Sequence, residues 1–304
     1  MAAPQPHLSI YDAVAANRWR TVLLIAVFTL IVTALVYAAG EYLAPGGGVA
    51  LIPFAVVFSG VSALTSYFAG DKLVLAQSQA RELAPGDEPQ LRNIVETLAI
   101  GLGIQPPKLY VIEDTAPNAF ATGRDPAHAS IAVTRGLLQK MDRTELEGVL
   151  AHEMSHVVNR DIRVMLLVTV LVGTVALISD WMLRSMRFGG RRDRDRGGGG
   201  VIVLIAIVLA ILTPIIATLI QLAVSRQREY LADASGALLT RYPHGLASAL
   251  QKIAADPEPL EAANKATASL YIANPLHDRP TFMDGLFDTH PPIAERVRRL
   301  ESMG

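Results

Sequence analysis

Residues 150–161 decide the fold, and they read Leu-Ala-His-Glu-Met-Ser-His-Val-Val-Asn-Arg-Asp. On a helix, residues four apart lie one turn apart on the same face, so His152 and His156 can bind one zinc ion. The intervening Glu153 lies near the metal and can deprotonate a water bound to it. The alternative is a pair of ordinary hydrogen-bonded histidines. The metal site is favoured because the sequence around the pattern predicts a well-capped amphipathic helix.

That helix has a clear start. Asp142 and Glu145 have the spacing of a capping box, with aspartate in place of serine or threonine. Apolar residues then recur at helical spacing up to the second histidine and beyond, at Leu146, Val149, Leu150 and Val157.

A catalytic zinc site has three protein ligands and an open position, so a third ligand is required. The chain has no cysteine, which leaves His, Asp or Glu. Glu229 and Asp233 repeat the four-residue spacing on a second predicted helix. Glu229 is the candidate ligand, and Asp233 is a candidate partner that fixes the tautomer of a ligand histidine. The alternative is a solvated helix face whose charges pair with Arg226 and Arg228.

Composition indicates a membrane protein. Of the 304 residues 51% are hydrophobic, and the mean hydropathy is +0.34. Four apolar segments reach the roughly 20 residues that span a bilayer. They cover residues 21–39, 48–69, 164–183 and 201–222. A formal net charge of −1 gives no reason to expect nucleic acid as a partner.

The distribution of basic residues predicts an orientation. Arg18, Arg20, Lys72 and Arg81 flank the first two apolar segments on one side, whereas the loop between them has no Lys or Arg. The positive-inside rule therefore places residues 71–163 in the cytoplasm. The basic loop 184–196 conflicts with four simple crossings, so the alternative is that the last two segments form a hairpin that does not fully cross.

The polar region predicts mixed helix and strand. Strands are expected at 108–113, 118–123 and 129–134, and helices from Asp87 and Pro89, over 225–239 and over 291–300. The fold class is α+β and mostly helical, an integral membrane protein with four apolar helices. The expected parts are a helix pair (1–73), a first domain part (74–163), a second helix pair with an Arg/Gly-rich loop at 184–200 (164–222), and a second domain part (223–304).

Two further features have competing interpretations. Residues Asn118, Ala119, Phe120 and Ala121 form either an edge strand that pairs with an extended substrate or an ordinary internal strand. His290 and Arg296 either stabilise the oxyanion of a tetrahedral intermediate or serve as a helix cap and a surface charge.

Several stretches, in this order, resemble the HtpX-type heat-shock membrane proteases, relatives of the CAAX prenyl endopeptidases within the gluzincin class. They are residues 118–123, 150–161, 225–233 and 289–292, together with Glu295 and Arg296. The resemblance implies a zincin-like protease domain with a small sheet. It also implies one zinc ion at His152, His156 and Glu229, with Glu153 as the general base.

The resemblance further implies cleavage of damaged or misassembled membrane proteins at the cytoplasmic face of the cell membrane. Expected partners are membrane-protein or unfolded polypeptide substrates, the lipid bilayer, and further copies of the chain or other quality-control proteins. A CAAX-type endopeptidase acting on prenylated tails is the first alternative. A non-catalytic membrane adaptor with a structural zinc is the second, although Glu153 would have no purpose there.

Overall fold

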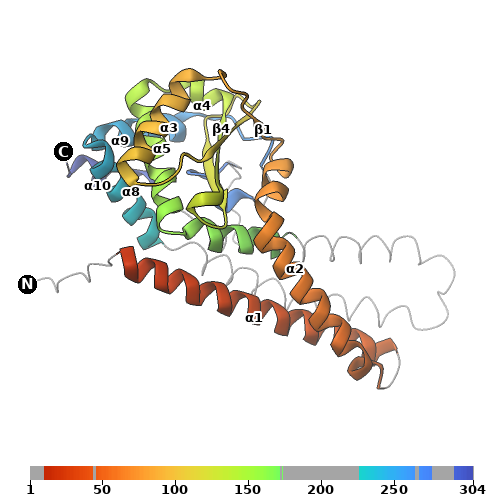
Figure 1. The fold of residues 1–304 in the computed structure, drawn as a ribbon. Helices are drawn as coiled ribbons and strands as arrows, with labels where there is room; N and C mark the ends of the chain where they lie inside the picture. The colour runs from red at the N-terminus through yellow and green to blue at the C-terminus, as the bar shows by residue number, and fades with distance from the viewer. Residues whose placement is uncertain are drawn as a thin grey trace, which may run out of the picture.

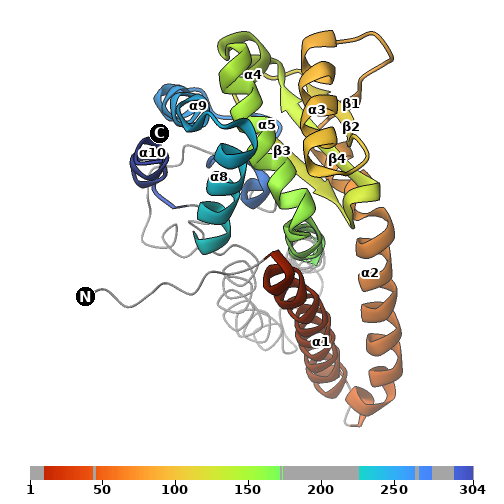
Figure 2. The ribbon, with the colours of Figure 1, turned by 60° about the vertical axis from the view of Figure 1, so that its left-hand side comes forward.

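The computed structural model describes residues 10–43, 46–171, 173, 226–263, 267–275 and 291–303. These residues are mostly helical and contain one small mixed sheet. Two long helices, α1 (Ile10–Leu43) and α2 (Gly47–Gln77), lie side by side at one end (Figures 1 and 2). The sheet and the shorter helices lie together beyond the C-terminal end of α2.

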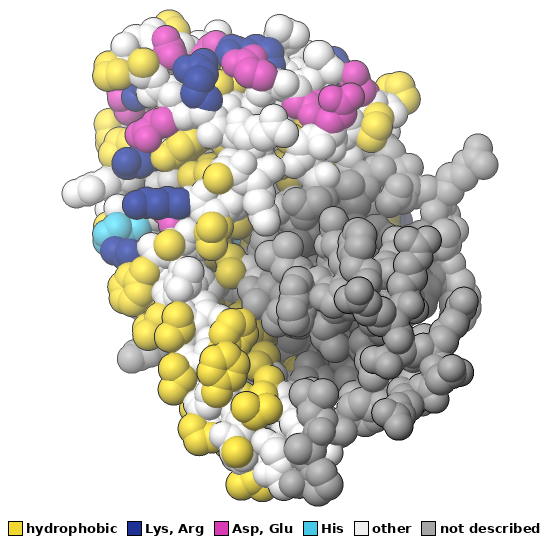
Figure 3. Space-filling view, turned by 90° about the vertical axis from the view of Figure 1, so that its right-hand side faces the viewer, with side chains coloured by type: hydrophobic (Ala, Val, Ile, Leu, Met, Phe, Trp, Pro, Cys, Tyr) yellow, Lys and Arg dark blue, Asp and Glu magenta, His cyan; other side chains and the backbone are white. Residues whose placement is uncertain are grey.

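The first two predicted apolar segments lie within α1 and α2. In the described part of the chain, α2 is the one helix long and apolar enough to cross a membrane, and α1 contains a shorter apolar stretch at Trp19–Ala34. The hydrophobic side chains that α2 exposes include Phe54, Val57, Val61, Leu64 and Phe68. Figure 3 shows hydrophobic side chains over the lower part of the described surface and charged side chains over its upper part.

The other two predicted apolar segments are not established by the structure. Residues 161–171 are helical, which covers the start of the third segment. The remainder of that segment, from residue 174 on, and the whole of 201–222 lie outside the described residues. Four apolar helices are therefore not confirmed.

The sheet has four strands in the order β1-β2-β4-β3. Strand β2 (Lys108–Ile112) pairs in parallel with β4 (Ala129–Thr134), whereas β1 (Arg81–Glu82) and β3 (Ala119–Gly123) pair antiparallel with their neighbours. The three predicted strands are confirmed, and β1 was not predicted. Strand β3 lies at the edge of the sheet, as the edge-strand interpretation requires.

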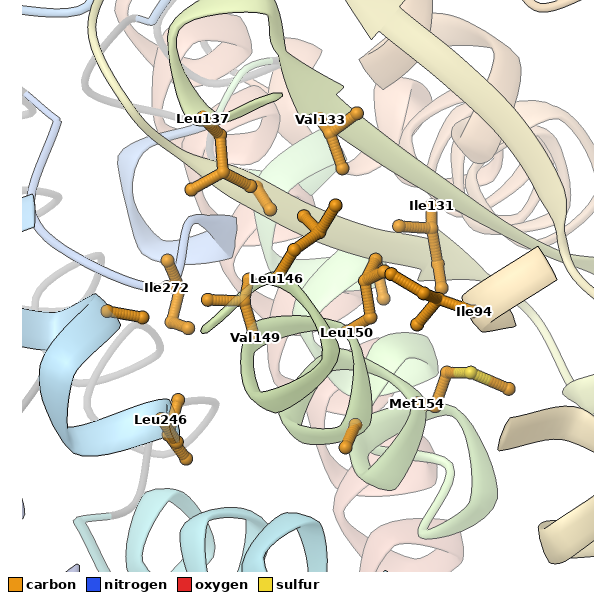
Figure 4. Packing of buried hydrophobic residues seen from close by; sticks show 14 of the residues in the cluster. Ile94, Ile131, Val133, Leu137, Leu146, Val149, Leu150, Met154, Leu246 and Ile272 are labelled. Carbon is orange, nitrogen blue, oxygen red and sulfur yellow. The ribbon is translucent and has the colours of Figure 1, made fainter. Parts of the chain in front are cut away.

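Helix α5 (Arg143–Val158) is the centre of the domain. Its predicted capping box is present, because Asp142 accepts from the Glu145 N–H at 2.9 Å and Glu145 accepts from the Asp142 N–H at 2.9 Å. Figure 4 shows its apolar side chains packed among residues of neighbouring elements. These residues are Ile94 on α3 (Pro89–Leu102), Ile131 and Val133 on β4, Leu246 on α9 (Pro243–Ala255), and Ile272.

The sequence correctly predicted a helix here, but the prediction that one of its faces meets solvent is wrong. Every residue of α5 from 148 to 157 is buried, so neither face meets water. The polar residues of the helix face a second set of helices instead of solvent. These are α8 (Arg226–Thr240) and α10 (Ile293–Glu301), which confirm the helices predicted at 225–239 and 291–300. Helices α4 (Arg135–Lys140) and α9 were not predicted.

Helices α5 and α8 approach closely at Gly236. A Cβ atom at this position would lie 3.0 Å from the backbone nitrogen of His152. The absence of a side chain therefore lets α8 pack directly on the turn of α5 that carries the first histidine. This packing brings the predicted third ligand, two turns earlier on α8, to the face of α5 that bears both histidines.

Candidate metal centre

Helices α5 and α8 bring three potential ligands together. The Nε2 atoms of His152 and His156 are 3.2 Å apart, and carboxylate oxygens of Glu229 lie 3.8 Å and 3.5 Å from them respectively. All three side chains are buried, with at most 5% of each residue exposed. Within the described residues they form a group of His and Glu that could hold a metal ion.

The spacing of these atoms fits a tetrahedral ion. Zinc binds nitrogen and oxygen at about 2.0–2.2 Å, which places two tetrahedral ligands about 3.4 Å apart. The closest approaches of 3.2, 3.5 and 3.8 Å lie around this value, with Oε2 of Glu229 nearest to His152 and Oε1 nearest to His156. The chemistry of the donors, two imidazoles and one carboxylate, is also that of a known class of catalytic zinc sites. The residues present therefore fit the ion.

Each histidine turns its other ring nitrogen toward a buried carboxylate. The Nδ1 of His152 lies 3.0 Å from Asp233, and the Nδ1 of His156 lies 3.1 Å from Asp161. A proton on Nδ1 in each ring leaves Nε2 free to bind a metal, and the carboxylate fixes the ring orientation. The role expected of Asp233 from the sequence agrees with its position, whereas Asp161 had no role assigned.

A break in the helix brings Asp161 to this position. Helix α5 ends at Val158, and Arg160 adopts a left-handed conformation with φ of 59°. Such a conformation is uncommon outside glycine and stops the α-helix. The chain changes direction there and a new helix starts at residue 161, so the first side chain of the new helix faces back onto the last turn of α5.

The candidate general base lies at the same centre. Glu153 is 2% exposed, and the backbone N–H of Ala121 on β3 favours its charged form. Burial raises the pKa of Glu153 to about 8, and the Glu229 carboxylate adds to this shift. The carboxylate thus lies between the ligands and the edge strand, where a base for an attacking water is required.

The electrostatics of the two histidines differ. Burial lowers the pKa of His152 to about 4. Burial also disfavours the cation of His156, but its hydrogen bond to Asp161 and the charge of Glu229 outweigh this effect and raise the pKa of His156 to about 9. A positive charge is therefore favoured at His156, beside Glu229 and Asp161, and disfavoured at His152.

Arg296, another predicted site residue, is fully buried, with 0% exposed. Its Nε and Nη2 donate to the two oxygens of Asp233 at 2.9 Å and 2.7 Å, and Nη1 donates to the carbonyl oxygen of Ile272 at 2.9 Å. The surface-charge alternative is therefore wrong. The arrangement favours a positioning role, in which Arg296 holds Asp233 against His152. A role as oxyanion donor stays a prediction.

The outer edge of β3 is partly occupied. The carbonyl oxygen of Ala119 accepts from the N–H of Ile272 at 3.0 Å, and the Asn118 side chain donates to the Ala273 carbonyl at 3.2 Å. The side chain of Phe120 is fully buried against Tyr271. The substrate-binding role of residues 118–121 stays a prediction.

His290 lies outside the described residues, so its predicted role is not tested by the geometry. Pro292 is the residue that precedes α10, and it forms no side-chain hydrogen bond that caps this helix.

Comparisons with known proteins identify the family of the chain. Peptidase family M48 matches residues 85–304. A protease HtpX homolog from Dictyoglomus thermophilum is 44% identical over 300 residues, which cover 97% of this chain and 95% of that protein. Another from Tropheryma whipplei (strain Twist) is 45% identical over 295 residues, with 97% and 99% covered.

Among solved structures, the chain is similar to the crystal structure of S. mikatae Ste24p, with a TM-score of 0.49 and 18% sequence identity. The similarity covers 96% of this chain and 66% of that one. The sequence relatives are far closer and span nearly the whole chain. From the family match over residues 85–304 and these relatives, the chain belongs to peptidase family M48 and is a metalloprotease of the HtpX type.

Proposed function

We propose that the chain is a zinc endopeptidase that cleaves misfolded or damaged membrane proteins at the cytoplasmic face of the membrane. One zinc ion per chain is held by His152, His156 and Glu229, and Glu153 is the general base. The observation that carries the proposal is the approach of three ligand atoms to within 4.8 Å of one another in a buried centre that also contains Glu153. Glu153 has no use in a purely structural zinc site.

The residues of the chain divide the chemistry among them. A bound zinc ion supplies a water whose pKa lies near neutrality. Glu153 accepts a proton from the attacking water and passes it to the leaving amine. The Ala121 N–H on β3 favours the charged carboxylate, so an extended peptide paired with the edge of β3 would present its backbone near the base.

The position of the centre supports a membrane substrate. The apolar helix α2 and the similarity to the HtpX homologs support membrane association. His156 is followed eight residues later by Val164, where an apolar helical stretch begins. Because the chain turns at Arg160, His156 lies against Asp161 at 3.1 Å. Val164 is three residues, or about 4.5 Å, further along the helix that Asp161 begins. A bilayer around that stretch would therefore lie close to the centre. Unfolded segments of membrane proteins are the natural substrates for this location.

The direct test is cleavage of an unfolded substrate such as casein by the purified full chain in detergent. The zinc-loaded protein is expected to cleave it, a chelator to stop cleavage, and added zinc to restore it. A prenylated tail peptide tests the CAAX-type alternative in the same assay. A protein that keeps one zinc ion per chain but cleaves none of these substrates would contradict the proposed enzyme and favour the adaptor.

The proposed orientation has its own test, because the chain contains no cysteine. Single cysteines at Gly47, before the second apolar segment, and at the exposed Gln139 report the two sides of the membrane. Gly47 is preferred to Gly46, whose φ of 80° disfavours any side chain. We expect an impermeant thiol reagent applied from outside to label Gly47→Cys and to spare Gln139→Cys until the membrane is permeabilised. Labelling of Gln139→Cys in intact cells contradicts the orientation.

The role of Arg296 is tested by Arg296→Lys, which keeps the charge but removes the two-pronged contact with Asp233. If Arg296 positions Asp233, zinc affinity is expected to fall about 10–100-fold, the usual loss for an outer hydrogen-bond partner. The kcat at saturating zinc stays near the parental value. Arg299→Lys, a half-exposed position on the same helix, is the control. Unchanged zinc affinity with kcat reduced about 100-fold would instead make Arg296 an oxyanion donor.

A further inference from the structure

We propose that Asn17, on the first long helix, is a positioning residue of the metal centre. Its side-chain amide holds Asp161, and Asp161 holds the ring of His156. The inference rests on the proposed function, because it takes His156 as a zinc ligand. It goes beyond that function by making a helix 130 residues and more away in sequence part of the centre.

The contact is short and buried. Asn17 Nδ2 donates to Oδ1 of Asp161 at 2.7 Å, while Oδ2 of the same carboxylate faces His156 Nδ1 at 3.1 Å. Asn17 is 2% exposed and Asp161 is 1% exposed. A hydrogen bond to a charged acceptor contributes more than a neutral one, and a buried carboxylate that loses a donor is left with an uncompensated charge.

All the hydrogen-bonding groups of the Asn17 amide are in use. The second proton on Nδ2 is donated to the backbone carbonyl of Asn159 at 3.1 Å, at the end of α5. Its Oδ1 accepts from Arg20 at 3.3 Å. Rotating the amide would turn its oxygen toward the Asp161 carboxylate, so the two acceptors fix the orientation shown. Asn17 thereby ties together the end of α5 and the start of the next helix, on both sides of the turn at Arg160.

Packing farther along α1 keeps this contact in place. Leu24, Phe28 and Val32 are buried at successive turns on the side of α1 that also carries Asn17. Phe28 and Val32 pack with Leu171 on the helix that Asp161 begins. The first long helix is therefore held against the helix that leaves the metal centre, and Asn17 is the polar end of that interface.

Arg228 also donates to the Asp161 carboxylate, from Nη1 to Oδ1 at 3.3 Å. This contact is longer than the 2.7 Å bond from Asn17, and it reaches the same oxygen. Asp161 would thus keep a cation nearby without Asn17, which is why we expect its loss to weaken the centre and not to abolish it.

The test is zinc affinity, measured by competition with a chelator in the full chain in detergent micelles. Asn17→Leu keeps the side-chain volume and removes both donors. We expect zinc to bind about 10-fold more weakly, with KM unchanged and kcat restored by excess zinc. Thr21→Val removes a hydroxyl one turn along the same helix, which bonds only to the Asn17 backbone carbonyl, and is expected to bind zinc as the parent does.

A double-mutant cycle decides whether Asn17 acts through Asp161. In an Asp161→Asn background, Asn17→Leu is expected to change zinc affinity by less than about twofold, because coupled residues do not add. Full additivity overturns the proposal. So does a single variant that melts at lower temperature yet binds zinc with parental affinity. Asn17→Ser, whose side chain is one bond shorter, gives the same readings should the leucine variant not fold. A parent that holds no zinc contradicts the proposed function itself, whereas unaltered affinity in the variants contradicts this inference alone.

Discussion

Glu153→Gln is expected to lose peptidase activity by about 10²–10⁴-fold, the usual contribution of a general base, while the bound metal is retained. The change removes the proton acceptor and leaves His152, His156 and Glu229 untouched. It should also leave the fold intact or make it more stable. Burial raises the pKa of Glu153, which means that its charged form is disfavoured in the folded protein and that folding at neutral pH carries this cost. A neutral amide of the same size avoids it.

Casein cleavage, zinc content and the melting temperature of the same preparation measure the three expectations. Glu147→Gln is a matched control, since Glu147 lies on the same helix and is only partly buried. It should behave as the parent does. A Glu153→Gln protein with full activity would contradict the proposed mechanism, and one without zinc would mean that Glu153 also helps to hold the metal.

Much of the fold follows from local signals. The capping box at Asp142 and Glu145 fixes the start of α5, and the strands β2, β3 and β4 lie where apolar stretches are bounded by turn residues. Helix α9 was missed although its hydrophobic spacing is clear, with Leu246, Leu250 and Ile253 buried. Strand β1 has two residues and exists only because it pairs with β2. A pairing of this kind has no signal in its own sequence.

The candidate site likewise contains residues that the sequence predicts and residues that it does not. Two ligands and the base are one helical turn of a single motif, so their spacing alone brings them together. Glu229 was predicted only because a catalytic zinc site has three protein ligands and the motif supplies two. Its position depends on the close packing of α5 and α8 at Gly236. The contact between Asn17 and Asp161 joins residues 144 apart in sequence. Nothing in the local pattern of an apolar helix marks one asparagine near its start as a partner of a distant carboxylate.

The expected amphipathic helix was wrong for a reason that bears on stability. The polar side of α5 faces Glu229, Asp233 and Arg296, all of them 2% exposed or less. A buried cluster with two imidazoles and several carboxylates is costly unless its charges are compensated. A cation bound only by the folded state stabilises it, by about 4 kcal/mol when its concentration is 1,000 times the dissociation constant. Metal binding and folding are therefore expected to be linked in this chain.

Glu229→Gln is expected to show that link most clearly. It replaces a charged ligand by a neutral amide of the same shape, so zinc affinity should fall by more than the 10–100-fold typical of outer partners. Asp233→Asn should stay within that range, because Asp233 contacts His152 and not the metal. Both amides avoid the large cavity that alanine would leave, and Asp233→Asn keeps an oxygen for Arg296 to bond.

The measurement is the melting temperature of the full chain with and without added zinc, beside the zinc retained after dialysis against a mild chelator. The parent should melt at a higher temperature with zinc, Asp233→Asn should need more zinc for the same rise, and Glu229→Gln should show almost none. Glu295→Gln, on α10 outside the centre, should match the parent. If Glu229→Gln retains zinc and melts as the parent does, the third ligand lies elsewhere in the chain. The approach of Glu229 to both histidines, at 3.8 Å and 3.5 Å, would then reflect packing alone.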